Sequence, residues 1–254
     1  MANWTGGRIA LGLAAALLGL GAAAVEGAYR EIEVTGGAKI AGQVRVTGEV
    51  TPLPPQPVFK EHDECGESVP DERLVIDSEH RLANAVVRLV DVGAGKPIAR
   101  SEPVRLDNRK CTFVPHVVAA AVGQTLDIRN DDPFLHDAHA WLGTRTLFNL
   151  AVPKGRTVHS VLADPGIVHV NCNVRHTWMH AYLFVAENPY VAVTDASGGF
   201  TLGDVPPGTY KIAVWHELLG SQEREVTVAP GQAVTVDFAL DAVAPMEPGP
   251  PRED

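Results

Sequence analysis

Cysteine is scarce in this chain: among 254 residues there are three, Cys65, Cys111 and Cys172. An odd number cannot all pair with one another, so one thiol is left for another role. Long helical periodicity is missing after residue 25, which leaves strands as the dominant element. Basic residues are outnumbered, 21 against 31 acidic ones. This balance argues against nucleic acid or an anionic membrane surface as the partner.

Turn-forming residues are plentiful by contrast, with 24 Gly and 19 Pro between short Val-rich runs. Such closely spaced apolar runs predict an all-β chain, with antiparallel β-sandwich architecture as the fold class. The expected strands cover residues 39–46, 74–76, 85–90, 111–118, 125–130, 157–162, 167–172, 181–186, 190–194, 200–202, 210–216, 223–228 and 233–240.

The first 24 residues have the pattern of a secretory signal peptide. Arg8 precedes an apolar run over residues 9–24, and the run ends in three alanines that offer a cleavage site. An uncleaved membrane anchor is the alternative, although the run falls short of the roughly 20 residues that a bilayer needs. No cysteine directly follows the run, so a lipid anchor is not expected. We predict a periplasmic or secreted protein with no stable membrane insertion after cleavage.

The strongest chemical signal is a Cys-x3-His-x2-Met loop formed by Cys172, His176 and Met179. Residues 135–139 supply two further histidines, His136 and His139. One thiolate, two imidazoles and a thioether are the ligands of a blue-copper electron-transfer site. Side chains alternate along a strand, so Cys172 shares the face of the valines at 168 and 170 and is expected to point inward.

The second imidazole has two candidates. If residues 135–141 are extended, His136 and His139 face opposite sides, and only one can reach the site. Leu126 and Ile128 are the inward pair of the preceding strand, and Asn130 continues their face. This places the turn after Asn130 near the Cys172 loop, favours His136 over His139, and makes Asn130 a candidate hydrogen-bonding neighbour of the site.

At these residues the chain resembles the cupredoxins, in particular the amicyanin and plastocyanin branch. The resemblance covers residues 83–187 and implies a cupredoxin-like Greek-key β-sandwich with one type 1 copper ion bound by His136, Cys172, His176 and Met179. It also implies that the loop histidine, His176, presents its ring edge at the surface and passes the electron. The loop departs from the family's usual Cys-x2-His spacing by one residue, taken to be Arg175, and it lacks the second cysteine of a dinuclear copper centre.

The two remaining cysteines, Cys65 and Cys111, form the natural disulfide once Cys172 is assigned to the loop. Disulfides are favoured in oxidising compartments, which agrees with export. Three reduced thiols are the alternative.

Residues 190–240 resemble the carboxypeptidase regulatory-like, transthyretin-like modules through two turns, at residues 194–200 and 205–210. That resemblance implies a small transthyretin-like or Ig-like β-sandwich without catalytic residues. The expected divisions are a signal at 1–24, an N-terminal strand and Pro-rich connector packing on the cupredoxin domain at 25–82, the cupredoxin-like domain at 83–187, the module at 188–241 and a disordered tail at 242–254. The combination resembles a group of exported bacterial proteins.

The function expected from these features is single-electron transfer by an exported copper protein that is not an enzyme, with a cytochrome or oxidase-like redox partner. The alternatives are a non-redox envelope scaffold in which copper is absent or stored, and a zinc site. A copper oxidase or reductase ranks last, because the sequence offers no second cluster of ligands. His116, His159 and His169 are expected to be surface or structural residues, and His180 is not expected to be a ligand. For His216, which ends a strand of the second domain, a position facing the loop end of the first domain is the less favoured alternative.

Overall fold

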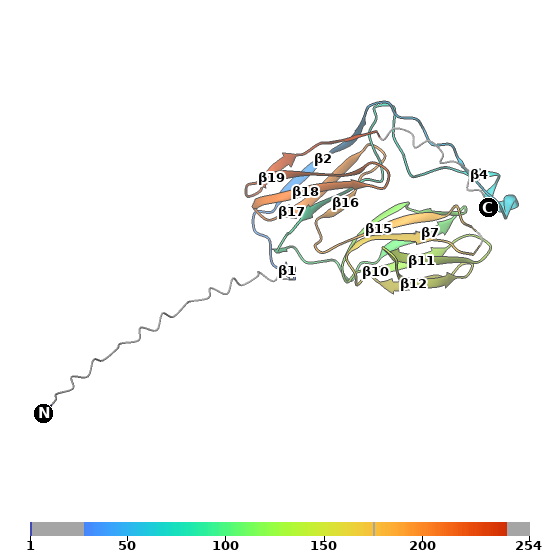
Figure 1. Cartoon of the computed structure of the whole chain (residues 1–254), viewed down its shortest axis with the longest axis horizontal. Coiled ribbons are helices and arrows are strands. Elements are labelled where there is room, and N and C mark those ends of the chain that lie inside the picture. The colour runs from blue at the N-terminus through green and yellow to red at the C-terminus, as the bar shows by residue number, and fades with distance from the viewer. Residues whose placement is uncertain (2–27, 175, 243–254) are drawn as a thin grey trace.

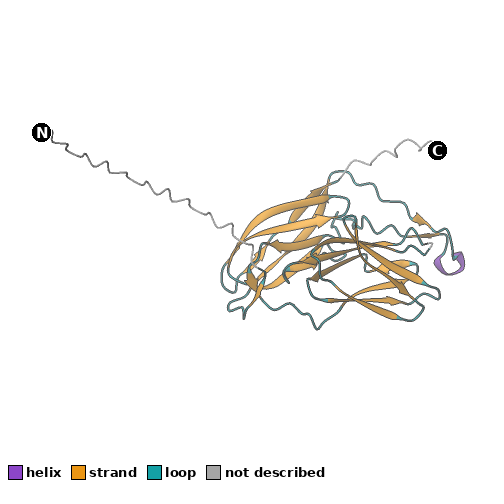
Figure 2. Ribbon diagram, turned by 60° about the horizontal axis from the view of Figure 1, so that its bottom comes forward, coloured by secondary structure: helices purple, strands orange, loops and turns teal. Residues whose placement is uncertain are grey.

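The computed structural model describes residues 1, 28–174 and 176–242. The chain folds into two β-sandwiches that lie side by side (Figure 1). The helical content of the described residues is one short turn, α1 (His62–Cys65), at the periphery of the molecule (Figure 2). None of the described helices has the length and apolar character needed to cross a membrane. The all-β prediction is confirmed.

The first sandwich consists of a four-stranded and a five-stranded sheet. The four-stranded sheet has the order β13 (Thr157–Val161), β10 (Thr125–Asn130), β7 (Val104–Arg109) and β8 (Thr112–Val114). The five-stranded sheet has the order β12 (Arg145–Val152), β11 (His136–Leu142), β14 (Gly166–Asn171), β15 (His180–Ala186) and β9 (Val117–Ala121).

The sheets of this sandwich are mixed, which corrects the purely antiparallel expectation. β10 runs parallel to β7, and β9 runs parallel to β15. The chain passes from one sheet to the other between β8 and β9, so β9 joins the edge of the second sheet alongside the much later β15. Period-2 alternation fills the core between the sheets: Leu126 and Ile128 are fully buried, as are Val168 and Val170.

The second sandwich is assembled from both ends of the chain. One sheet has the order β16 (Val191–Val193), β5 (Val86–Val90), β18 (Gly208–His216) and β19 (Gly220–Val228). The other contains β17 (Gly199–Val205), β2 (Ala38–Thr47) and β20 (Ala233–Thr235), and β2 also pairs with β21 (Phe238–Asp241). In Figure 1 the blue β2 lies among the orange and red C-terminal strands.

The pairing of β2 and β5 differs from the expected domain divisions. The N-terminal strand was expected to pack on the cupredoxin-like domain, and residues 85–90 were expected inside it. The structure instead pairs Ile40 with Leu202 and Val87 with Val214, both in the C-terminal sandwich. An alternating strand fits any apolar sheet face, so its pattern does not specify which sandwich it joins. The expected signal (apart from Met1) and nearly all of the expected tail lie outside the described residues.

The connector between β2 and β5 runs along the first sandwich and covers its loop end. It contains the short pair β3 (Gln56–Pro57) and β4 (Ser68–Val69), with α1 between them. Cys65, in α1, forms the predicted disulfide with Cys111, which precedes β8. A further short pair, β1 (Arg30–Glu31) with β6 (Ala94–Gly95), lies near the start of the described chain.

Candidate metal centre

Two adjacent strands bring the main candidate ligands together. His136 is the first residue of β11, and Cys172 follows the last residue of β14. The two strands pair antiparallel, with His139 opposite Asn171, so the start of β11 lies beside the end of β14. The predicted inward direction of Cys172 is confirmed, because its side chain is buried together with Val168 and Val170.

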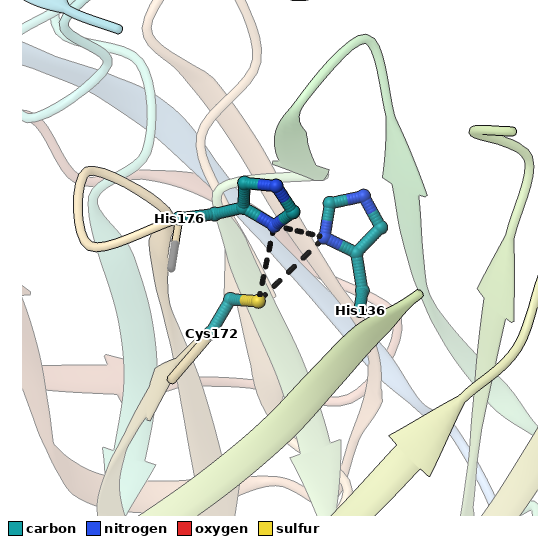
Figure 3. Close-up of side chains that lie close together, drawn as sticks. All are labelled: His136, Cys172 and His176. Atoms are coloured by element: carbon teal, nitrogen blue, oxygen red, sulfur yellow. Dashed lines mark hydrogen bonds between the residues drawn. The ribbon is translucent and has the colours of Figure 1, made fainter. Parts of the chain in front are cut away.

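The side chains of His136, Cys172 and His176 converge on one point (Figure 3). The Cys172 Sγ atom lies 3.6 Å from Nδ1 of His136 and 3.6 Å from Nδ1 of His176. The two Nδ1 atoms are 3.1 Å apart. All three residues are buried, so these are three soft or borderline donor atoms grouped away from water.

This triangle of donor atoms has the size that a transition-metal ion requires. A point equidistant from three atoms at these separations lies about 2.0 Å from each, which matches the metal–imidazole distance of about 2.0–2.1 Å and approaches the metal–thiolate distance of about 2.3 Å. The donor set therefore fits a copper or zinc ion, which these three residues would hold.

Asp132 fixes the orientation of the His136 ring. The Nε2–H group of His136 donates to the Asp132 carboxylate over 3.0 Å, which leaves the lone pair of Nδ1 facing Cys172. The same carboxylate accepts from the backbone N–H groups of Lys110 and Cys111 at 2.7 and 2.9 Å. Burial alone raises the pKa of Asp132, but these three hydrogen bonds outweigh it and lower the pKa below its usual value. A ligand histidine held by a carboxylate is a common feature of metal sites.

Asn130 organises the turn that carries Asp132 and His136. Its amide nitrogen donates to the carbonyl groups of Phe134 and Val152, each at 2.7 Å, and its oxygen accepts from the N–H of Asp132 at 2.9 Å. The residue is fully buried. Asn130 thus acts on the site through the backbone of the turn.

Asp137 plays the corresponding part for the cysteine loop. Its carboxylate accepts from the N–H groups of Asn173 and Val174 at 2.6 and 3.1 Å. The loop then returns: the N–H of Met179 donates to the carbonyl of His176, and the N–H of Cys172 donates to the carbonyl of Met179. Met179 is buried, and its backbone lies against that of Cys172. Arg175, the expected extra residue of this loop, lies outside the described residues.

The pKa values at the site follow from burial. Burial raises the pKa of the Cys172 thiol to about 11, with a contribution from the nearby Asp137 carboxylate. Burial also lowers the pKa of His176, and the neighbouring His136 lowers it further. At neutral pH the isolated protein therefore holds a thiol beside a neutral imidazole. A bound cation would displace the thiol proton, so metal affinity is expected to rise with pH.

His139, the alternative imidazole, lies on the other side of β11. Its Nε2 atom is 3.0 Å from Thr146 Oγ1, and its ring stacks near Trp141 with centroids 4.0 Å apart. It therefore takes no part in the cluster, as the alternation of β11 requires.

His176 is buried, which corrects the expectation of an exposed ring edge. Its exposed fraction is 3%. The ring of Phe134 lies 5.2 Å from that of His176, and Trp178 lies 5.3 Å away on another side. The Trp178 indole N–H donates to the carbonyl of disulfide-bonded Cys111, and Phe59 of the connector packs on Trp178. The connector between β2 and β5 therefore covers this end of the sandwich, although it is not part of the Cys-x3-His-x2-Met motif.

Comparison with a family model identifies the C-terminal module. Residues 181–241 match the model of the carboxypeptidase regulatory-like domain. This segment is therefore similar to that domain family. The match confirms the resemblance predicted from the sequence, and it begins inside β15. The matched residues do not include β2 and β5, although these two strands complete the C-terminal sandwich. No curated protein matches the chain.

Solved structures that resemble part of the chain are copper proteins and cupredoxins by name. The copper-containing nitrite reductase of Thermus scotoductus SA-01 is 23% identical over 34% of this chain, with a TM-score of 0.32, and the match spans 23% of that enzyme. A purple cupredoxin from Nitrosopumilus maritimus is 20% identical over 33% of this chain and 99% of its own, with a TM-score of 0.30. Amicyanin from Paracoccus versutus is 18% identical over 35% of this chain and 91% of its own, also with a TM-score of 0.30.

Proposed function

We propose that this protein is an exported mononuclear copper protein that transfers single electrons. The observation that carries the proposal is the convergence of three buried donor atoms, Cys172 Sγ and the Nδ1 atoms of His136 and His176, at separations of 3.1–3.6 Å. Met179, in the same loop, supplies a thioether as the weak fourth ligand. A copper ion bound there supplies the Cu(I)/Cu(II) couple, and thus the capacity to carry one electron.

The surrounding residues support that role by keeping the donors in place. Asp132 and Asp137 each hold one side of the site through hydrogen bonds to a ring or to loop backbone, so neither oxidation state requires the ligands to move. No acid–base pair for catalysis is needed, which agrees with a carrier role. The Cys65–Cys111 disulfide fits an oxidising compartment, and we propose the periplasm or the cell exterior as the location.

The redox partner is proposed to be a cytochrome or an oxidase-like protein. The burial of His176 means that its ring edge is not the direct contact, so the electron would pass through the side chains that cover it. Phe59 and Leu135 are the exposed apolar residues near this end, at 66% and 43% exposure, and they form the proposed contact surface.

The second candidate function is a non-redox scaffold or copper store. The burial of His176 favours it, because an enclosed site exchanges electrons more slowly than one with an exposed ligand. The two functions differ in the rate at which a small ferricyanide-type oxidant, or a reduced cytochrome, changes the oxidation state of the bound copper. Exchange within milliseconds supports the carrier, whereas exchange over minutes supports the store.

The test of the copper site is the visible spectrum after Cu(II) is added to the full chain. An intense thiolate-to-copper band is expected for the wild-type protein, together with one equivalent of copper bound at this site. Cys172→Ser and His136→Gln should lose the band while circular dichroism shows an intact fold. The matched control is His139→Gln, three residues further along the same strand, which should keep the band. A colourless wild-type protein after copper addition refutes the proposal.

A further inference from the structure

A second group of potential ligands lies where the two sandwiches meet. His116, just before β9, and His180, the first residue of β15, belong to the first sandwich, whereas Glu217 follows β18 of the second. One donor atom from each of the three lies within 4.8 Å of the other two. The three residues are separated by up to 101 positions in sequence, so only the packing of the two sandwiches brings them together.

We propose that His116, His180 and Glu217 form a second metal site, distinct from the Cys172 centre, that binds a borderline divalent cation of the zinc class. Two imidazoles and one carboxylate are an established ligand set for zinc with an open coordination position. The site contains no thiolate, so its ion would not give the charge-transfer band of the first site.

His180 is prepared for this role by its hydrogen bonding. Its Nδ1 atom lies 3.1 Å from the carbonyl oxygen of Trp178, which can only accept, so Nδ1 carries the ring proton. The lone pair of a neutral imidazole is then on Nε2. That Nε2 atom is buried and has no hydrogen-bond partner. A buried polar atom without a partner costs about 1–3 kcal/mol, so its presence requires an explanation, and an ion is one of those that fit.

His116 and Glu217 supply the other two donors. The His116 Nε2 atom contacts a carboxylate oxygen of Glu217, and the two side chains are 3% and 4% exposed. Buried polar side chains need hydrogen-bond partners or a metal ion to offset their lost hydration, and a metal ion bound to both groups would do so. The rings of His116 and His180 meet edge to face with centroids 5.2 Å apart, so both imidazoles border the same small volume.

A cavity of about 20 Å³ adjoins this group. His116 and His180 both line it, and so does the half-buried Glu72. That volume is enough for about one water molecule, which is the size of the open coordination position of a three-ligand zinc site.

The competing explanation is a purely structural His–Glu pair that fastens the two sandwiches. The first sandwich also contains a His–carboxylate pair at its surface, between His159 and Asp127, whose side chains are 62% and 21% exposed. The two side chains are 2.7 Å apart, and among the described residues they belong to no group of three potential ligands. His159 therefore provides the matched control.

The experiment is a zinc titration of the full chain in the Cys172→Ser background, followed by calorimetry and elemental analysis after chelator competition. We expect one tightly bound zinc equivalent. Glu217→Gln and His116→Gln should each weaken zinc binding at least 100-fold, because the loss of a direct ligand exceeds the 10–100-fold effect of an outer-shell partner. His159→Gln should leave the affinity unchanged. No bound zinc, or zinc binding that is indifferent to Glu217, overturns the proposal.

A second measurement needs no substitution at the new site. Crystals of the Cys172→Ser protein grown with zinc should give an anomalous peak at the zinc edge between His116, His180 and Glu217. A peak only beside His136 overturns the proposal. The copper band of the wild-type protein is read separately, so a failure of the electron-transfer proposal and a failure of this one are distinguishable.

Discussion

The carboxylate of Asp132 offers the most informative single perturbation, the substitution Asp132→Asn. It keeps the size of the side chain but removes its charge and replaces one acceptor oxygen with a donor. Three donors share this carboxylate: the buried His136 ring and Cys111 N–H group, and the part-buried N–H group of Lys110. An amide has one oxygen, so at least one of these donors loses its acceptor.

The expected effects follow from that count. A buried donor left without a partner costs about 1–3 kcal/mol of unfolding free energy, which urea denaturation would measure. The ring of His136 loses its charged hydrogen-bond partner, and an outer-shell change of this kind lowers metal affinity by about 10–100-fold. Copper affinity is measured by competition with a chelator of known affinity, with the visible band as the signal.

The neighbouring Asp131→Asn is the control. Asp131 pairs with Arg129 on the surface, where the two side chains are 33% and 54% exposed, and exposed ion pairs contribute at most about 1 kcal/mol. Both the unfolding free energy and the copper affinity should stay close to wild type. If Asp132→Asn and Asp131→Asn proved indistinguishable in copper affinity, the role assigned to Asp132 would be refuted.

Two further predictions concern the frame around the site. Asn130→Ala should lower the unfolding free energy by about 3 kcal/mol, because three buried or part-buried backbone groups lose a partner at about 1 kcal/mol each. Thermal denaturation measures this loss, and a loss below about 1 kcal/mol would contradict the role of Asn130 in the turn. The double substitution of Cys65 and Cys111 to Ala should lower it by about 4 kcal/mol, the chain-entropy value for a sequence separation of 46 residues. Chemical denaturation under non-reducing conditions checks the second value, and an unchanged midpoint would contradict it.

The candidate ligands that converge at the first site were predictable because they depend on local patterns. Alternation along β14 sets the inward direction of Cys172, and alternation along β11 separates His136 from His139. Neither argument requires knowledge of which strands pair. The pairing of Cys65 with Cys111 followed from simple elimination once Cys172 was assigned.

The residues that the sequence did not reveal act across long separations. Asp132 reaches the backbone of Lys110 and Cys111, and Asp137 reaches a loop 36 residues later. A carboxylate in a turn has no pattern that specifies such partners. The burial of His176 depends on a Pro-rich connector whose course over the site has no periodic signal. The meeting of His116 with Glu217 depends on how two whole sandwiches pack, so the sequence alone offers no sign of this second group of potential ligands.

The assembly of the second sandwich leads to a prediction about independence. The carboxypeptidase regulatory-like match covers residues 181–241, but β2 and β5 are interior strands of its two sheets. Ile40, Val44, Val87 and Leu89 of these strands are fully buried in its core. Each such side chain contributes about 1.5–3 kcal/mol, or roughly 6–12 kcal/mol for the four, which is comparable to the total stability of a domain, about 5–15 kcal/mol.

A fragment of residues 188–254 should therefore be unfolded on its own, with the narrow amide dispersion of a disordered chain in its proton–nitrogen correlation spectrum. Adding a second fragment, residues 28–98, should restore dispersed resonances by supplying β2 and β5, because the two sheets close only when both strands are present. The full chain serves as the folded control. If the fragment 188–254 folded cooperatively alone, β2 and β5 would not be required for this sandwich to fold, and the prediction would be wrong.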